Sequence, residues 1–153
     1  MGEQQCCLSI RLATNTDLPA IKAIADANRD SLGFVIRAAL AEHIARGWLY
    51  VAVYDNLISG FVNFRRRKDG WTVIYEICVA TTIRGHGIGG QLLSKVYATD
   101  LDQGRRGLRL KCPVDSLANN FYAALGLRRI GLEPGKRREL VLWEWRGVRR
   151  CIL

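Results

Sequence analysis

Four glycines within six residues mark the stretch of this sequence with the clearest chemical content. Residues 79–93 read Val-Ala-Thr-Thr-Ile-Arg-Gly-His-Gly-Ile-Gly-Gly-Gln-Leu-Leu, which is the end of a predicted strand, a glycine-rich turn and the start of a predicted helix. Glycines leave backbone N–H groups uncovered, and the first amides of a helix lack internal partners. Because the positive end of the helix dipole lies at the same place, we expect an anion site, with pyrophosphate as its anion.

Spacing separates three phosphate-binding patterns that this loop could follow. The P-loop pattern fails, because Gln and Leu follow the last glycine where Lys and Ser or Thr are required. Residues 85–90 fit Gly-x-Gly-x-x-Gly, but a dinucleotide-binding fold carries that motif in its first βαβ unit, and here too little chain follows it. A third pattern, Arg/Gln-x-x-Gly-x-Gly/Ala, is met by Arg84, Gly87 and Gly89, after a strand that ends at Val79.

The elements that must position this loop follow from hydrophobic periodicity and turn residues. We predict strands at residues 8–13, 48–54, 57–64, 71–79, 108–114, 127–132 and 140–146, and helices after a Thr16-Asp17 cap and at residues 33–46, 88–102 and 116–125. The helix that follows the glycine loop makes a right-handed crossover, so the strands on either side of it should be parallel. The sequence predicts one α+β domain over residues 1–153, with about four helices and a mixed, mostly antiparallel twisted sheet of about seven strands around that parallel pair.

Apolar residues define which side of each element faces the core. The first helix should bury Leu18, Ile21, Ile24 and Ala25, and the second should bury Phe34, Ala38, Ala41, Ile44 and Ala45. In the strand at residues 71–79, alternation places Glu76 on the same face as Ile74 and Cys78. Glu76 is thus a carboxylate in the middle of an otherwise apolar strand.

The loop pattern and the order of elements resemble the GNAT N-acetyltransferase superfamily over essentially the whole chain. A second stretch, Ala-Asn-Asn-Phe-Tyr-Ala-Ala-Leu-Gly-Leu at residues 118–127, is similar to the family's Asn-x-x-Ala-x-x-Phe-Tyr-x-x-x-Gly-Phe segment. Three positions depart from the family: Thr81 replaces Pro, Leu127 replaces Phe, and Asp115 replaces an Asn that often lies near the cofactor in relatives.

This resemblance implies a co-substrate, acetyl-CoA, and no metal. In the family the pantetheine arm pairs with the strand that ends at the loop, here through backbone groups of Ile77 and Val79, like an added strand. Pyrophosphate would rest on the loop amides, and the Arg84 side chain would add its charge. The expected cofactor-binding residues are Ile77, Val79, Arg84, Gly85, Gly87, Ile88, Gly89, Gly90 and Asp115.

The reaction implied is direct transfer of the acetyl group to a primary amine. An alkyl amine has a pKa of about 10.4, so only about one part in 10³ is nucleophilic at neutral pH, and a base is useful. Glu76 is the candidate base, directly or through water. Tyr122 stands at the family's usual place for the acid that protonates the leaving thiolate, and the N–H of Val79 is the candidate oxyanion donor.

Each assignment has a structural alternative. Glu76 can instead pair with an arginine of a neighbouring strand, and Tyr122 can be a core aromatic residue beside Phe121. The glycine loop can be purely structural, although a glycine in the helical conformation lowers stability by roughly 0.5–1 kcal/mol. His86, the variable residue of the loop pattern, is expected to face solvent. The two histidines and five cysteines show no metal-binding spacing.

The formal net charge of +9 is the main compositional deviation. Basic clusters lie at residues 65–68, 105–106, 128–129, 136–138 and 149–150, all in predicted turns or at strand ends. They are either solvated turn residues that protect strand edges or a source of positive potential that attracts anionic partners such as coenzyme A, an acidic acceptor or nucleic acid.

No apolar run approaches the roughly 20 residues of a membrane helix, and no signal-peptide pattern is present, so we expect a cytoplasmic protein that does not bind membranes. The sequence leaves a homodimer open.

Three functions follow from these observations. The first is an acetyl-CoA-dependent N-acetyltransferase with a small-molecule or protein amine as acceptor, and the second is a coenzyme A-binding regulatory or interaction module without turnover. The third, a nucleic-acid-binding protein, lacks aromatic residues interleaved with the basic clusters. In the family the acceptor site is built by the first two helices, here around residues 28–34, and by the final hairpin.

Overall fold

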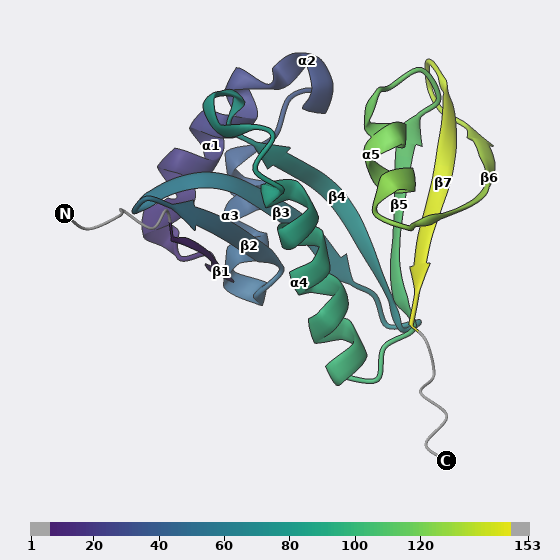
Figure 1. Cartoon of the computed structure of the whole chain (residues 1–153), viewed down its shortest axis with the longest axis horizontal. Helices are drawn as coiled ribbons and strands as arrows, with labels where there is room; N and C mark the ends of the chain where they lie inside the picture. Colours follow the sequence, from purple (N-terminus) through teal and green to yellow (C-terminus); the bar gives the residue numbers. More distant parts are fainter. Residues whose placement is uncertain (1–6, 148–153) are drawn as a thin grey trace. The chain divides into compact units, whose positions relative to one another are not determined.

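The strands and helices follow one another in the predicted order, apart from one additional short helix. We describe residues 7–147 from a computed structural model (Figure 1). The strands are β1 (Leu8–Leu12), β2 (Leu49–Tyr54), β3 (Leu57–Arg66), β4 (Trp71–Val79), β5 (Gly107–Pro113), β6 (Arg128–Pro134) and β7 (Glu139–Arg146). The helices are α1 (Leu18–Ala27), α2 (Arg29–Leu32), α3 (Arg37–Arg46), α4 (Ile88–Asp102) and α5 (Ala118–Ala124), with single 3-10 turns η1 (Asn15–Asp17) and η2 (Thr81–Ile83).

The strands form one mixed sheet in the order β1-β2-β3-β4-β5-β7-β6. β4 and β5 run parallel and pair over residues 71–73 with residues 107–109, whereas β2 pairs antiparallel with β1 and β3, and β7 pairs antiparallel with β5 and β6. This topology confirms the predicted α+β fold with a central parallel pair. The parallel direction of β4 and β5 requires a crossover connection between them, and α4 provides it.

The described chain divides into two compact units, and β4 contributes to both. The first unit contains the chain up to Arg65 together with Tyr75–Lys95, and the second contains Arg66–Ile74 together with the chain from Val96 onward. The single domain that the sequence predicts for residues 1–153 remains a prediction.

In the first unit, apolar residues of α1 and α3 pack with residues of β2, β3 and β4. The buried cluster consists of Ala13, Leu18, Ile21, Ile24, Ala25, Val35, Leu40, Ile44, Leu49, Val51, Phe61 and Cys78. The face predicted for α1 is therefore confirmed. η1 begins with a capping box between Thr14 and Asp17. The Asp17 carboxylate also lies 2.7 Å from the Arg11 guanidinium, and this hydrogen-bonded ion pair lowers the pKa of Asp17 to about 2.

The face predicted for the second helix was wrong in part. Phe34, Ala38 and Ala45 are exposed, while Leu40 is fully buried. The reason is a break in the chain direction: Gly33 has a left-handed φ of 73° and ends α2, so the next helix begins at Arg37 and not at residue 33. The later start places Phe34 outside the helix, and the buried face of α3 runs through Leu40 and Ile44.

The second unit is built from β5, β6, β7, α5, the later part of α4 and the first part of β4. Its buried side chains include Val96, Asp100, Leu108, Leu110, Cys112, Leu127, Val141 and Trp143. Asp100 is fully buried, and one of its oxygens lies 3.2 Å from Arg66 and 3.8 Å from Arg105. This ion pair ties α4 to the end of β3 and to the loop that precedes β5.

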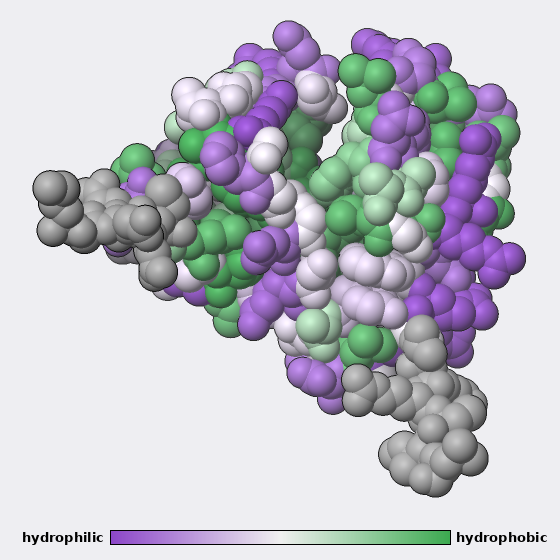
Figure 2. Space-filling view, viewed as in Figure 1, coloured by the Kyte–Doolittle hydropathy of each residue, from purple (hydrophilic) through white to green (hydrophobic). Residues whose placement is uncertain are grey.

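Hydrophilic residues cover much of the visible surface of both units (Figure 2). Arg65 near the end of β3, Arg67 and Lys68 in the following turn, and the hairpin residues 136–138 are all exposed. No helix within residues 7–147 is both long enough and apolar enough to cross a membrane.

Candidate active site

The glycine-rich loop has the backbone shape that its residues require. Gly85 and Gly87 have left-handed φ angles of 87° and 73°, which strongly favour glycine, and Arg84 before them is extended. α4 begins directly afterwards, and its first bond runs from the Gln91 amide to the Gly87 carbonyl at 3.1 Å. Gly87 is thus the N-cap position of α4.

Six consecutive amides in this loop have no partner. Among residues 7–147, none of the N–H groups from Gly85 to Gly90 donates a hydrogen bond. A Cβ built on Gly85 or Gly87 would meet no atom within 4 Å, so open space lies in front of both residues. Free donors, the positive end of a 15-residue helix and room for a ligand together suit a pyrophosphate group.

Arg84 points away from these amides. Its guanidinium donates to the side-chain oxygen of Asn28 and, at 3.4 Å, to the Val79 carbonyl. Asn28 is itself buried and donates to the Ile24 carbonyl at 2.8 Å, so its oxygen is held in place at the end of α1. The charge predicted to help bind pyrophosphate is therefore bound within the protein. His86 is exposed, as predicted.

The end of β4 is held closely against β3. The Ala80 amide donates to the Ser59 carbonyl at 2.8 Å, and a Cβ on Gly60 would come within 2.8 Å of the Cys78 carbonyl oxygen. Only glycine permits this approach. Ile77 and Val79, predicted to bind pantetheine, are half-buried and lie beyond the residues that pair with β5.

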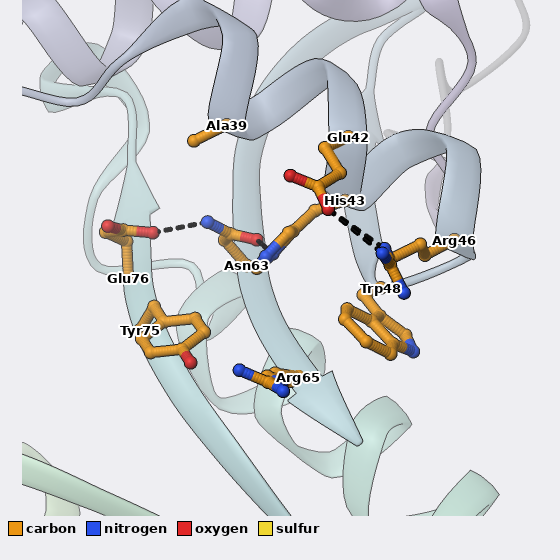
Figure 3. A pocket seen from close by; sticks show the side chains of 9 residues that line it. All are labelled: Ala39, Glu42, His43, Arg46, Trp48, Asn63, Arg65, Tyr75 and Glu76. Atoms are coloured by element: carbon orange, nitrogen blue, oxygen red, sulfur yellow. Dashed lines mark hydrogen bonds and ion pairs between the residues drawn. The ribbon is translucent and has the colours of Figure 1, made fainter. Parts of the chain in front are cut away.

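Glu76 belongs to a chain of three hydrogen-bonded side chains (Figure 3). Its Oε2 accepts a bond of 2.6 Å from Nδ2 of Asn63 on β3, and Oδ1 of Asn63 lies 2.5 Å from Nδ1 of His43 on α3. Asn63 is only 4% exposed, so both its bonds are sheltered from water. Glu76 makes no ion pair with any of residues 7–147, and thus the predicted alternative of a strand arginine is not observed.

Burial raises the pKa of Glu76 above its ordinary value, while the Asn63 hydrogen bond and the nearby His43 lower it by less. A carboxylate with a raised pKa holds a proton more tightly and is a stronger base. This is the direction that a general base for an amine requires.

A cavity of about 390 Å³ opens beside this chain of side chains. It is lined by Ala39, Glu42, His43, Arg46, Trp48, Asn63, Arg65, Tyr75 and Glu76. The α3 residues among them recur every three or four positions, and Asn63 and Arg65 are alternate residues of β3, so α3 and β3 each present one face. Of these three residues, only Glu76 was predicted from the sequence. A polar residue within apolar β3 was the available signal for Asn63.

The second unit contains Tyr122 and Asp115, and we describe them separately from the loop. Tyr122 is 7% exposed, with its ring 5.3 Å from that of Phe121 and 6.3 Å from that of Trp143. Its hydroxyl makes no hydrogen bond within residues 7–147, and burial raises its pKa. Tyr122 is therefore a core aromatic residue in its packing and also a protonated phenol with a free donor.

Asp115 lies at the surface. Its carboxylate is 3.3 Å from the Arg138 guanidinium in an exposed ion pair, so Arg138 and a ligand would compete for it. The nearby Asn119 side chain donates to the Pro113 carbonyl at 2.8 Å and accepts from Trp143 Nε1 at 2.9 Å. Asn119 thus fixes the turn between β5 and α5. Among the described residues, no group of three or more His, Cys, Asp or Glu side chains could hold a metal ion.

Residues 45–128 match the family described as "Acetyltransferase (GNAT) domain". A "5-NmdU N-acetyltransferase" of Pseudomonas phage PaMx11 is 32% identical over 104 residues, which cover 65% of this chain and 71% of that protein. A "Mycothiol acetyltransferase" of Brachybacterium faecium is 27% identical over 106 residues, covering 63% of this chain but only 32% of that protein.

Solved structures share the fold. Ard1 from Thermoplasma volcanium superposes with a TM-score of 0.82 and 16% identity, covering 92% of this chain and 98% of its own. N-acetylglutamate synthase from Neisseria gonorrhoeae, complexed with coenzyme A and N-acetyl-glutamate, superposes with a TM-score of 0.79 and 19% identity, covering 95% of this chain and 36% of its own. At these identities the likeness is one of fold.

Proposed function

As the chain belongs to the GNAT acetyltransferase family and is an acyltransferase, we propose that it moves the acetyl group of acetyl-CoA directly to a primary amine. The observation that carries this proposal is the row of unpartnered amides from Gly85 to Gly90 in front of α4. Every helix leaves about four amides without internal partners at its start, here those of Gly87 to Gly90, and Gly85 and His86 add two more donors directly before them. A continuous row of donors at the positive end of a helix is suited to bind an anion.

Residues of the first unit would hold most of the co-substrate. The loop amides would bind the pyrophosphate, and backbone groups of Ile77 and Val79 would pair with the pantetheine arm. Asp115 stays a further candidate contact. Acetyl-CoA supplies the acetyl group as a thioester, which is already activated for transfer.

The catalytic groups then have defined tasks. Glu76 removes one proton from the acceptor amine, for which its raised pKa is suited. Tyr122 gives one proton to the departing sulfur, and its pKa, raised by burial, keeps it protonated until then. The N–H of Val79 donates to the carbonyl oxygen as negative charge develops there.

The proposal is tested first by release of free thiol from acetyl-CoA in the presence of a broad panel of primary amines. We expect release that depends on both an amine and acetyl-CoA. Acetyl-CoA that raises the melting temperature but gives no thiol with any amine would instead support a coenzyme A-binding module without turnover.

Binding is tested by Gly87→Glu, because a carboxylate would fill the open space and repel the pyrophosphate. Gly104→Glu is the matched control: Gly104 also has a left-handed φ, 68°, and open space around its Cβ position, but it follows the far end of α4. Calorimetry should show loss of acetyl-CoA affinity in the Gly87 variant and none in the Gly104 variant. Equal affinities in two folded variants would contradict the assignment of the loop.

A further inference from the structure

The cavity beside Glu76 has different chemistry at its two ends. Glu76 and His43 meet at one end through the side chain of Asn63. Arg65 lines the other end, and Tyr75 and Trp48 contribute aromatic rings to the wall. His43 is packed between these rings, with centroids 5.4 Å from Trp48 and 5.6 Å from Tyr75.

The hydrogen bonds determine which atoms His43 can offer. Because an ionised Glu76 can only accept, Asn63 must present its NH₂ group to Glu76 and its oxygen to His43. Nδ1 of His43 must then carry a proton, so Nε2 is the nitrogen that can act as an acceptor when the ring carries a single proton. Nε2 has no hydrogen bond within residues 7–147. The cavity wall around Asn63 therefore offers two acceptors, a carboxylate on one side and an imidazole nitrogen on the other.

Arg65 is the free cation of the cavity among the described residues. Arg46, the other guanidinium, already pairs with Glu42 at 3.1 Å and lies over the Trp48 ring. Arg65 makes no ion pair or hydrogen bond within residues 7–147. It is the second residue after Asn63 on β3, and alternate residues of a strand are roughly 7 Å apart on one face. Arg65 therefore lies on the same face of β3 as Asn63, the residue that bonds to both acceptors.

Resting on the acetyl transfer proposed above, we propose that this cavity is the acceptor site and that it selects a small primary amine that carries a carboxylate or a phosphate. The amine binds at Glu76 and His43, the anionic group binds Arg65, and the part between them lies along Tyr75. Arg65 and His43 are then specificity-determining residues, and Asn63 is a positioning residue that orients Glu76 and His43 together.

The test uses amines that differ only in the anionic group. 4-(Aminomethyl)benzoate carries its amine and carboxylate on opposite sides of a flat ring, and 4-(aminomethyl)benzamide is its neutral counterpart. O-phosphoethanolamine and ethanolamine form the phosphate pair. We expect kcat/KM to favour the charged member of at least one pair by about 10-fold, the size of one hydrogen-bonded charge contact, and the pair that responds identifies the anion.

Two variants connect this preference to the cavity. Arg65→Gln should reduce the ratio of kcat/KM between the charged and the neutral amine to near 1. Lys68→Gln removes the same charge from the neighbouring exposed turn and should leave this ratio unchanged. His43→Phe keeps an aromatic ring but removes both nitrogens, and it should raise KM for all amines while acetyl-CoA affinity stays the same.

Calorimetric binding of 4-(aminomethyl)benzoate and O-phosphoethanolamine separates this inference from the proposed function. Binding of either that is weakened by Arg65→Gln and not by Lys68→Gln supports the site even without turnover. Thiol release with equal kcat/KM for charged and neutral amines, or a charge preference that survives Arg65→Gln, overturns the inference and leaves the acetyltransferase standing. If no amine supports thiol release, the proposed function is overturned.

Discussion

At the scale of single residues, Tyr122 is a buried aromatic residue whose hydroxyl makes no hydrogen bond within the described chain. Removing that oxygen should therefore leave packing intact. We expect Tyr122→Phe to lower kcat on the order of 10²-fold and to leave acetyl-CoA affinity and the melting temperature nearly unchanged. Steady-state kinetics measure kcat, calorimetric titration measures the acetyl-CoA affinity, and a thermal melt gives the melting temperature.

Tyr97→Phe is the matched control. The Tyr97 hydroxyl donates to the Arg146 carbonyl at 2.9 Å, so this variant should lose a little stability and no kcat. Full activity of the Tyr122 variant would leave Tyr122 as a core residue only.

Glu76 and Asn63 make the pH dependence of the reaction predictable. Glu76 must be ionised to accept a proton, so kcat/KM should rise with pH through a pKa above the ordinary value of a glutamate. The Asn63 hydrogen bond lowers the Glu76 pKa, so Asn63→Leu should move this acid limb to higher pH. Glu76→Gln should lose most activity at low pH, where the amine is protonated, and recover in part as pH rises.

A pH–rate profile measures these effects, with a thermal melt at each pH to verify folding. A uniform loss at every pH in Glu76→Gln would indicate that Glu76 is structural. An unshifted acid limb in Asn63→Leu would show that Asn63 does not act on Glu76.

At the scale of elements, the later part of α4 is attached to its unit through a buried charge. Asp100 is fully buried beside Arg66 and Arg105, whose side chains are 17% and 18% exposed. Truncating Asp100 would leave the two guanidinium groups without this partner in a poorly hydrated place. We expect Asp100→Ala to lower the free energy of unfolding by about 3–5 kcal/mol, measured by urea denaturation.

Asp102 in the same helix is exposed and provides the control. Asp102→Ala should change the free energy of unfolding by less than about 0.5 kcal/mol. Similar losses in the two variants would mean that the effect comes from helix propensity or net charge and not from the buried ion pair.

At the scale of the whole molecule, the net charge of +9 should favour anionic ligands at long range. The exposed hairpin residues Lys136, Arg137 and Arg138 are suited to test this field. Changing all three to Gln should raise KM for an anionic acceptor by about 2- to 5-fold and flatten its dependence on salt, with acetyl-CoA affinity nearly unchanged. Kinetics at low and high ionic strength measure the slope; an unchanged KM and slope would identify the basic excess as surface chemistry alone.

Local features of this protein could be predicted from its sequence. The shape of the loop depends on Gly85 and Gly87, because left-handed backbone angles strongly favour glycine. The bounds of β4 and the crossover that makes it parallel to β5 follow from alternation and from the position of α4. The start of α3 was predicted too early. Residues 33–36 continue the helical pattern in the sequence, but in the structure they connect α2 to α3 and lie outside both helices.

Partnerships between distant residues were decided by the tertiary structure alone. Asn63 lies 13 residues from Glu76 and 20 from His43, and Arg84 reaches Asn28 across 56 residues. Periodicity states which face a residue occupies, but the strand register and the packing of α3 on the sheet determine which side chains meet there. For this reason the sequence indicated a carboxylate and an anion-binding loop, whereas the cavity with His43, Asn63 and Arg65 emerged only when α3, β3 and β4 came together.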